Sequence, residues 1–200
     1  MVVKPKNEFL NYLIQCIFDN QLAMKTLVET RKISSIELLF KELIDKRLKQ
    51  STVNFSKILK TLITPFDKDD LLTLSSLLID FSYQLDELSF YLYVSFDEKI
   101  NIIDKKYLLF LKNTWDHFAS KMSNVISINQ IAIILKDLKL IEQELLSQDL
   151  YYNSLKNVFF NENNPIKKEK RLMIISCIHR LHLLMIKIIR TMINAIIKSI

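Results

Sequence analysis

The sequence predicts an all-α protein built from six long helices that are joined by short polar loops. The 200 residues include no glycine and only three prolines, whereas an average chain of this length would carry about 14 glycines. Apolar residues recur at steps of three and four nearly throughout, which is the period of a helix. The chain is 50% apolar and 25% charged, a composition typical of one soluble domain with a single core.

The first two helices are predicted from apolar spacing and from a capping signal. The first runs from about Asn7 to Glu29, and its buried side is predicted to carry Phe9, Leu13, Ile17 and Met24. The second opens at "SSIE", where Ser34 is a good N-cap and Glu37 stands three residues later, a capping box. It ends before Pro65, because proline disfavours helical geometry at Thr64.

The stretch "ITPFDKDD" separates the second helix from the third. Thr64 or Asp67 can cap the third helix, and Asp70 gives a second capping box if Asp67 is the cap. Acidic side chains here also complement the positive end of the helix dipole. The third helix is predicted to end at about Val94.

Three further helices are predicted after a polar connection. Asp104 is expected to cap the fourth, which continues to Met122. A capping box in "SINQ", at Ser127 and Gln130, opens a long fifth helix to about Phe160. Asn164 then caps the sixth helix, with Pro165 at its first position, and this helix runs to the end of the sequence.

The order of the elements indicates an internal structural repeat of three helices. In each half a long second helix ends at a residue followed by proline, Thr64-Pro65 and Asn164-Pro165, about half the chain apart. Side-chain identity between the halves is slight. The repeat is therefore predicted for the architecture.

Several function classes are excluded by what the sequence lacks. Without glycine there is no phosphate-binding glycine loop and no dinucleotide fingerprint. No nucleophile elbow or HExxH motif is present, so we expect no catalytic residues and no cofactor. Cys16 and Cys177 have no metal or disulfide spacing and are expected in the core. The N-terminus has no signal-peptide pattern, which favours the cytoplasm.

The C-terminal helix is both basic and strongly apolar. Its cations are Lys167, Lys168, Lys170, Arg171, Arg180, Lys187, Arg190 and Lys198, in a chain of formal net charge +6. They interrupt the apolar run, so no membrane span is expected. The apolar face then packs in the bundle with the lysines in solvent, and deleting the helix unfolds the protein. Alternatively, the helix lies against an anionic membrane or a transporter loop.

The element "ITPFDKDDLLTLSSLLIDFSYQLDE" resembles the PhoU-like family whose genes accompany Pit-type phosphate transporters. Ile63, Thr64, Pro65, Phe66, Asp67 and Asp70 match the family's Ile-Thr-Pro-Phe-Asp element, and Lys68 and Asp69 are close substitutes. "KPKNEFLNYL" and "FFNENNPIKKEK" are similar to the family's entry segment and second-half junction. The resemblance spans essentially the whole chain.

The resemblance implies one PhoU-like domain over residues 1–200, with two pseudo-symmetric three-helix bundles in halves of about 1–96 and 104–200. It implies regulation of phosphate transport, usually as an oligomer. PhoU-like proteins also tend to bind metal clusters through acidic motifs, in which carboxylates one helical turn apart bridge hard cations.

This chain departs from those acidic motifs. On the third helix Asp80 and Asp86 remain, but Ile79 and Tyr83 stand where acids are expected. The second helix has the basic "LIDKRLKQ", the fifth keeps Glu144 without a second acid, and the sixth carries "HRLHLLMIK". We therefore expect no metal site, with Asp80 and Asp86 as the residual candidates and solvated surface acids as the alternative.

His179 and His182 form a second candidate pair, three residues apart on one helix face. Two histidines can bind a transition metal, but no acid or cysteine within a turn completes the site. The alternative is a histidine pair at a polar helix boundary.

The resulting prediction is a non-enzymatic cytoplasmic regulator of phosphate uptake that acts on a membrane phosphate permease, expected as a homo-oligomer. The alternative is a PhoU-fold binding or structural module that has lost metal and phosphate sensing and docks on an anionic membrane surface. Nucleic-acid binding is not expected, because the basic residues form no recognition motif.

Overall fold

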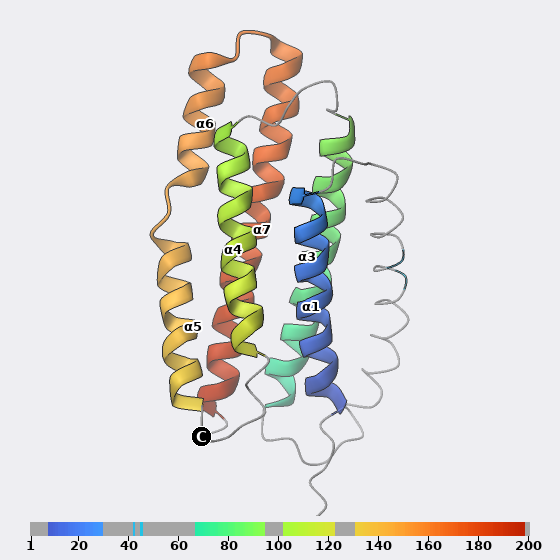
Figure 1. Ribbon diagram of the computed structural model, residues 1–200, viewed down its shortest axis with the longest axis vertical. Coiled ribbons are helices and arrows are strands. Elements are labelled where there is room, and N and C mark those ends of the chain that lie inside the picture. The colour runs from blue at the N-terminus through green and yellow to red at the C-terminus, as the bar shows by residue number, and fades with distance from the viewer. Residues whose placement is uncertain are drawn as a thin grey trace, which may run out of the picture.

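The computed structural model describes residues 8–29, 42, 45, 67–94, 102–122 and 131–198, and within these ranges every regular element is a helix. The helices are α1 (Glu8–Glu29), α3 (Lys68–Val94), α4 (Ile102–Met122), α5 (Ile131–Leu146), α6 (Leu150–Asn161) and α7 (Pro165–Lys198) (Figure 1). The predicted all-α class is confirmed.

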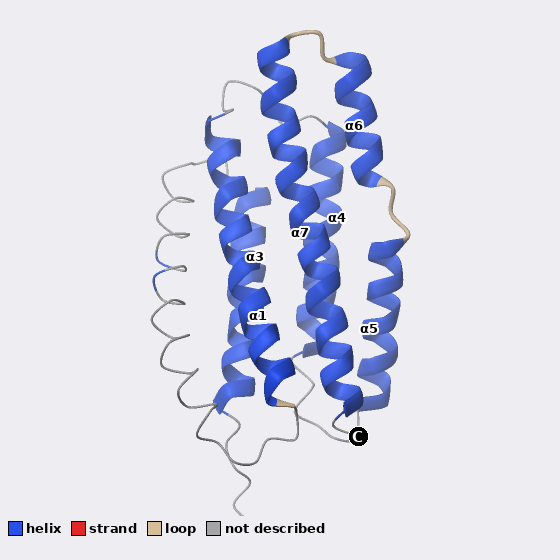
Figure 2. Cartoon of the chain, turned by 180° about the vertical axis from the view of Figure 1, so that it is seen from behind, coloured by secondary structure: helices blue, strands red, loops and turns tan. Residues whose placement is uncertain are grey.

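The long helix α7 is the element against which most others pack. It contacts α3, α4, α5 and α6, whereas α1 packs against α3 and α4. Figure 2 shows α7 between α3 on one side and α5 and α6 on the other. Elements of both halves of the sequence share one apolar core. Apart from Glu42 and Asp45, the predicted second helix, with its Ser34 box and Pro65 stop, lies outside the described residues, so the two-bundle arrangement stays a prediction.

The predicted helix ends agree with the structure where the local signal is strong. The backbone N–H of Asp69 donates to Asp67 Oδ1 at 3.0 Å, which makes Asp67 the cap of α3. Asn164 caps α7, because its Oδ1 accepts from the N–H groups of Ile166 (3.0 Å) and Lys167 (3.2 Å). Both caps satisfy N–H groups of the first turn, which have no partner within the helix.

The prediction of one long fifth helix is wrong. The chain forms α5 and α6 instead, separated by Ser147, Gln148 and Asp149. Neither glycine nor proline stands at this break. The contact that accompanies it comes from α7, where His182 Nε2 lies 2.9 Å from the Leu145 carbonyl oxygen in the last turn of α5. The "SINQ" capping box lies outside the described residues.

An aromatic cluster joins α1, α3 and α4. Trp115 is fully buried and stacks on Phe81 with ring centroids 4.2 Å apart. Its indole N–H donates to the Ile17 carbonyl oxygen at 3.1 Å. Nearby, Asn20 donates to the Leu78 carbonyl and accepts from Ser82. The polar atoms of this inner region therefore bond across helices, which sets how α1, α3 and α4 meet.

The apolar face of α7 packs in the bundle, as the first of the two alternatives for this helix predicted. Thirteen of its residues are buried, Cys177 among them, and Cys16 is buried on α1. By length and composition alone α7 is the one helix in the described ranges that could cross a membrane, with a mean hydropathy of 1.8 over its most apolar window. Half of that window is buried, as in the central helix of a folded core.

Neighbouring residues of α7 test this packing. Ile188 is fully buried, whereas Lys187 is exposed. We expect Ile188→Ala to lower the free energy of unfolding by about 2–5 kcal/mol, because it removes buried methyl groups and leaves a cavity. Lys187→Ala, the matched control, should change it by less than about 0.5 kcal/mol. Urea unfolding followed by circular dichroism measures both, and equal losses would contradict this orientation of α7.

Candidate functional site

The acidic residues predicted as remnants of a metal site do not come together. Asp80 is exposed on α3 and Asp86 is partly buried, and six positions place them about 120° apart around the helix axis. Glu144 is exposed on α5. Among the described residues, no three His, Cys, Asp or Glu side chains converge in a way that could hold a metal ion.

A partly buried polar seam lies instead where α4, α6 and α7 meet. We use this name for eight residues, which are Asp104 and Tyr107 of α4, Tyr151, Ser154 and Asn157 of α6, and Arg171, His179 and His182 of α7. On α4 and α6 they recur at three-residue steps, and on α7 at steps of eight and three residues, so on each helix they share one face. The seam has an ionic end and a histidine end.

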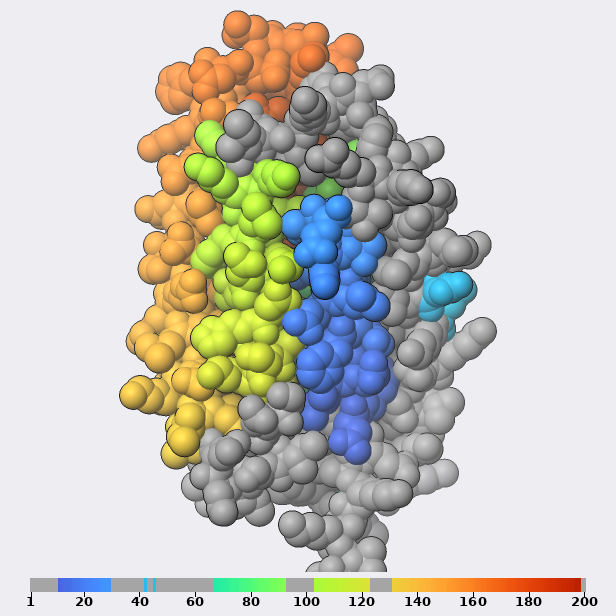
Figure 3. Space-filling view, viewed as in Figure 1, coloured from blue at the N-terminus to red at the C-terminus, as the bar shows by residue number. Residues whose placement is uncertain are grey.

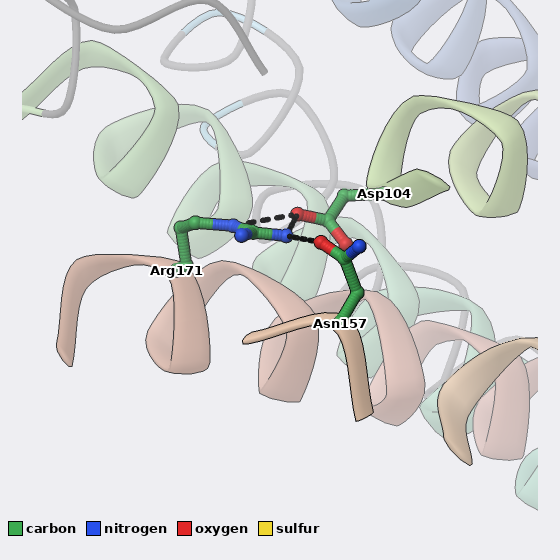
Figure 4. A network of polar contacts seen from close by, with 3 residues as sticks. All are labelled: Asp104, Asn157 and Arg171. Atoms are coloured by element: carbon green, nitrogen blue, oxygen red, sulfur yellow. Dashed lines mark hydrogen bonds and ion pairs between the residues drawn. The ribbon is translucent and has the colours of Figure 1, made fainter. Parts of the chain in front are cut away.

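The ionic end is built around Asp104 (Figure 4). Arg171 donates to Asp104 Oδ2 through Nε at 3.3 Å and through Nη2 at 3.0 Å, and the same Nη2 donates to Asn157 Oδ1 at 3.0 Å. The Asp104 side chain is 3% exposed and that of Arg171 is 12%. One guanidinium thus links three helices.

The predicted role of Asp104 as a helix cap is wrong. Because α4 begins at Ile102, Asp104 lies inside the first turn. Its charge still complements the helix dipole, but its carboxylate is directed to a partner 67 residues away. The prediction of a cap used only neighbouring residues, whereas the partner, Arg171, is remote in the sequence.

Burial dominates the electrostatics of Asp104. Desolvation raises the pKa of its carboxyl above the usual value, although the charge and hydrogen bonds of Arg171 act in the opposite direction. The Ser154 hydroxyl faces Asp104 without a well-formed hydrogen bond and favours the carboxylate more weakly. The ion pair therefore orients the helices more than it stabilises them.

The histidine end is centred on His182, which is buried. Its Nδ1 lies 2.7 Å from the Tyr107 hydroxyl, and its Nε2 lies 2.9 Å from the Leu145 carbonyl oxygen. A carbonyl oxygen only accepts, so Nε2 carries the hydrogen. Nδ1 of the neutral ring then accepts from the Tyr107 hydroxyl, and burial lowers the pKa of His182 in agreement with a neutral ring.

His179 completes this end of the seam. Its ring stacks on Tyr151, with centroids 3.8 Å apart and planes 12° from parallel, and its Nδ1 lies 3.4 Å from the Tyr107 hydroxyl. Burial lowers the pKa of His179 as well. Both histidines lie inside α7 and not at its ends. The boundary that His182 contacts is the end of α5.

The basic residues of α7 pair with acids far more than the sequence indicated. Arg180 bonds Glu87 at 3.1 Å, and Arg190 bonds Glu142 at 2.7 Å. Lys198 Nζ lies 2.8 Å from Asp70 Oδ2 and 3.7 Å from Asp67 Oδ2. Asp70, expected in a second capping box, thus joins the start of α3 to the end of α7.

The side chains of the seam hold helices together, and their interactions are sensitive to acid. Outside the seam, desolvation raises the pKa of the Cys177 thiol to about 11, so the thiol stays protonated at neutral pH and is a poor nucleophile. The two histidines have rings and a backbone carbonyl as neighbours, with no third metal-binding side chain within the described ranges. The seam can hold α4, α6 and α7 in register, and it can respond to protonation.

Two solved structures from Shewanella oneidensis MR-1 match this arrangement of helices. One is a PhoU-like protein that aligns over 95% of this chain and 96% of its own, with a TM-score of 0.66 and 13% identity. The other, described as a PhoU-like phosphate regulatory protein, aligns over 94% and 95%, with a TM-score of 0.61 and 15% identity. The chain has the PhoU-like fold.

No family model matches the sequence, and no curated protein does. The identity to the two PhoU-like structures is low enough that the likeness concerns the fold alone. The alignment nevertheless extends over nearly the whole length of each PhoU-like chain. The proposed role of this chain must therefore combine the PhoU-like fold with its own residues.

Replacing the ionic end of the seam tests its energetic role. We expect Asp104→Leu alone to lower the free energy of unfolding by about 3–5 kcal/mol, because Arg171 is left buried without its partner. The double variant Asp104→Leu with Arg171→Met should recover most of that loss, because no buried charge remains. A double-mutant cycle in urea measures both. If the double variant is as unstable as the single variant, the conclusion that this ion pair orients the helices more than it stabilises them is wrong.

Protonation of His182 should destabilise the PhoU-like fold. Its pKa in the folded state is lowered, so the unfolded chain takes up the proton first on acidification. The free energy of unfolding should therefore fall as the pH drops below the unfolded value of about 6.5, until the folded pKa is reached. In His182→Gln this dependence should shrink, whereas His117→Gln, at an exposed position of α4, should keep it. Equal pH profiles for all three proteins would contradict the assignment.

Proposed function

We propose that this chain is a non-enzymatic regulator of phosphate uptake that acts by contact with a membrane phosphate permease. The observation that carries the proposal is the PhoU-like fold over nearly the full chain, since one of the matching structures is described as a phosphate regulatory protein. The chain's resemblance to the Pit-accessory type at "ITPFDKDD" supports the permease as the target.

The described part of that element supports a structural use of its acids. Asp67 caps α3, and Asp67 and Asp70 both contact Lys198 at the far end of α7. The element thus joins a helix of the first half to the last helix of the second half. An interaction of this kind can carry a change at one helix end into the long central helix.

The proposed mode of action requires no catalysis and no resident metal. The acids of the resembled motifs are replaced in the sequence, and the remaining Asp80 and Asp86 point in different directions from α3. We propose a cytoplasmic homo-oligomer that touches the inner face of the membrane through its permease, with no role for nucleic acid.

A second candidate function follows from the same replacements. The chain can be a PhoU-fold binding or structural module that no longer senses phosphate or metal. The observation that favours it is the seam, where Arg171 is bound by Asp104 and Asn157 and both histidines contact aromatic groups or a carbonyl. These groups serve packing in this chain.

A tagged pull-down from gently solubilised membranes separates the two candidates. We expect mass spectrometry to recover a phosphate permease as the main membrane partner, enriched over a preparation with the untagged chain. Phosphate uptake should also change in cells that lack this chain. If no permease is recovered and uptake is unaltered, the regulator proposal is wrong and the structural module replaces it.

A further inference from the structure

The hairpin formed by α6 and α7 projects beyond the other described helices. The upper ends of α3 and α4 lie well below it, and Figures 1 and 2 show this from opposite sides. In the space-filling view the same segment, in orange, forms the upper end of the molecule (Figure 3). We call residues 156–170 the hairpin tip.

The tip exposes three large apolar side chains at the turn. Phe160 is 82% exposed, Ile166 is 67% exposed and Phe159 is 58% exposed. Single exposed apolar residues are normal on a soluble protein, but neighbouring ones mark an interaction site. Phe159 and Phe160 are adjacent in sequence. Lys168 Nζ, from α7, lies 4.6 Å above the Phe159 ring, so the α6 and α7 parts of the tip are in contact.

Positive charge surrounds these apolar side chains. The tip contains Lys156, Lys167, Lys168 and Lys170 against Glu162 and Glu169, a net charge of +2. Two further exposed lysines follow Asp104 on α4, at the level where Asp104 meets Arg171 and Asn157. By contrast, Arg180, Arg190 and Lys198 further along α7 are neutralised by acids. Among the residues that the structure describes, the tip thus carries a net positive charge beside exposed apolar side chains.

We infer that the hairpin tip docks on an anionic lipid bilayer. Aromatic side chains favour the headgroup level of a membrane, where the ring meets acyl chains. Lysines beside them are attracted by anionic headgroups. A projecting convex tip of this composition fits a deformable lipid surface, and the charge complementarity commits the site to anionic lipid. The inference is independent of the proposed permease partner.

Binding to lipid vesicles without any other protein tests the inference. We expect the full chain to co-sediment with phosphatidylcholine vesicles that contain phosphatidylglycerol, and only weakly with phosphatidylcholine alone. Added salt should weaken the binding, because it screens the attraction. Phe159→Ser with Phe160→Ser should lower the partition coefficient by about tenfold or more. Tyr152→Ser with Leu140→Ser, at exposed apolar positions outside the tip, should leave it unchanged.

A charge series gives a second measurement on the same vesicles. Lys156→Gln, Lys168→Gln and Lys170→Gln together should reduce binding by about fivefold for each lysine removed. Lys25→Gln, Lys136→Gln and Lys139→Gln remove the same charge from exposed positions of α1 and α5 and should have a much smaller effect. Equal losses in the two triple variants would overturn the inference, because net charge alone would then explain the binding.

The outcomes also separate this inference from the proposed function. The docking inference is wrong if the wild-type chain does not bind anionic vesicles, or if the phenylalanine variant binds them as well as wild type. Either result counts against it even when a permease is recovered. If the chain binds vesicles through the tip but no permease is recovered, the inference holds and the regulator proposal fails. A tip variant that changes the oligomeric mass and leaves vesicle binding intact would assign the tip to a second copy, against the inference.

Discussion

Burial of α7 is the constraint on which the rest of the structure depends. This helix packs against α3, α4, α5 and α6, and eleven of its thirteen buried residues belong to the core shared by both halves of the sequence. Each partner helix has to present an apolar stripe at the right height along α7. The ion pairs at Glu87, Glu142 and Asp70 join α3 and α5 to the more exposed side of α7, where such pairs add little stability.

The ion pair at the ionic end of the seam contributes more to geometry than to stability. Desolvation outweighs the attraction of Arg171 in setting the pKa of Asp104, so an apolar pair of equal size would stabilise the bundle at least as well. A buried ion pair tolerates few alternative arrangements, however, since any shift leaves a charge without its partner. His182 adds a similar constraint, because the break after α5 presents a carbonyl that its ring can reach. The seam therefore makes α4, α6 and α7 meet in one way.

Local signals in the sequence predicted what local physics controls. The caps at Asp67 and Asn164 follow from side-chain hydrogen bonds within a few residues. No proline or glycine stands at the break at Ser147–Asp149. The contact beside this break comes from His182, which lies 37 residues after its partner Leu145. Asp104 likewise has the local pattern of a cap and a remote partner. A single sequence contains no pairing information of that kind, so the seam could not be predicted from it.

The difference between local signals and remote contacts also limits what the charge of a sequence indicates about function. The formal net charge of +6 indicated a basic chain, but the sequence alone could not show which cations are neutralised. In the folded chain Arg171, Arg180 and Arg190 are paired with acids contributed by α4, α3 and α5. A cation beside an exposed aromatic ring can contact an anionic surface. A cation that is held by a carboxylate is already neutralised and contributes less to such a contact. For this reason the location of Phe159 and Phe160 is more informative about a partner than the total charge.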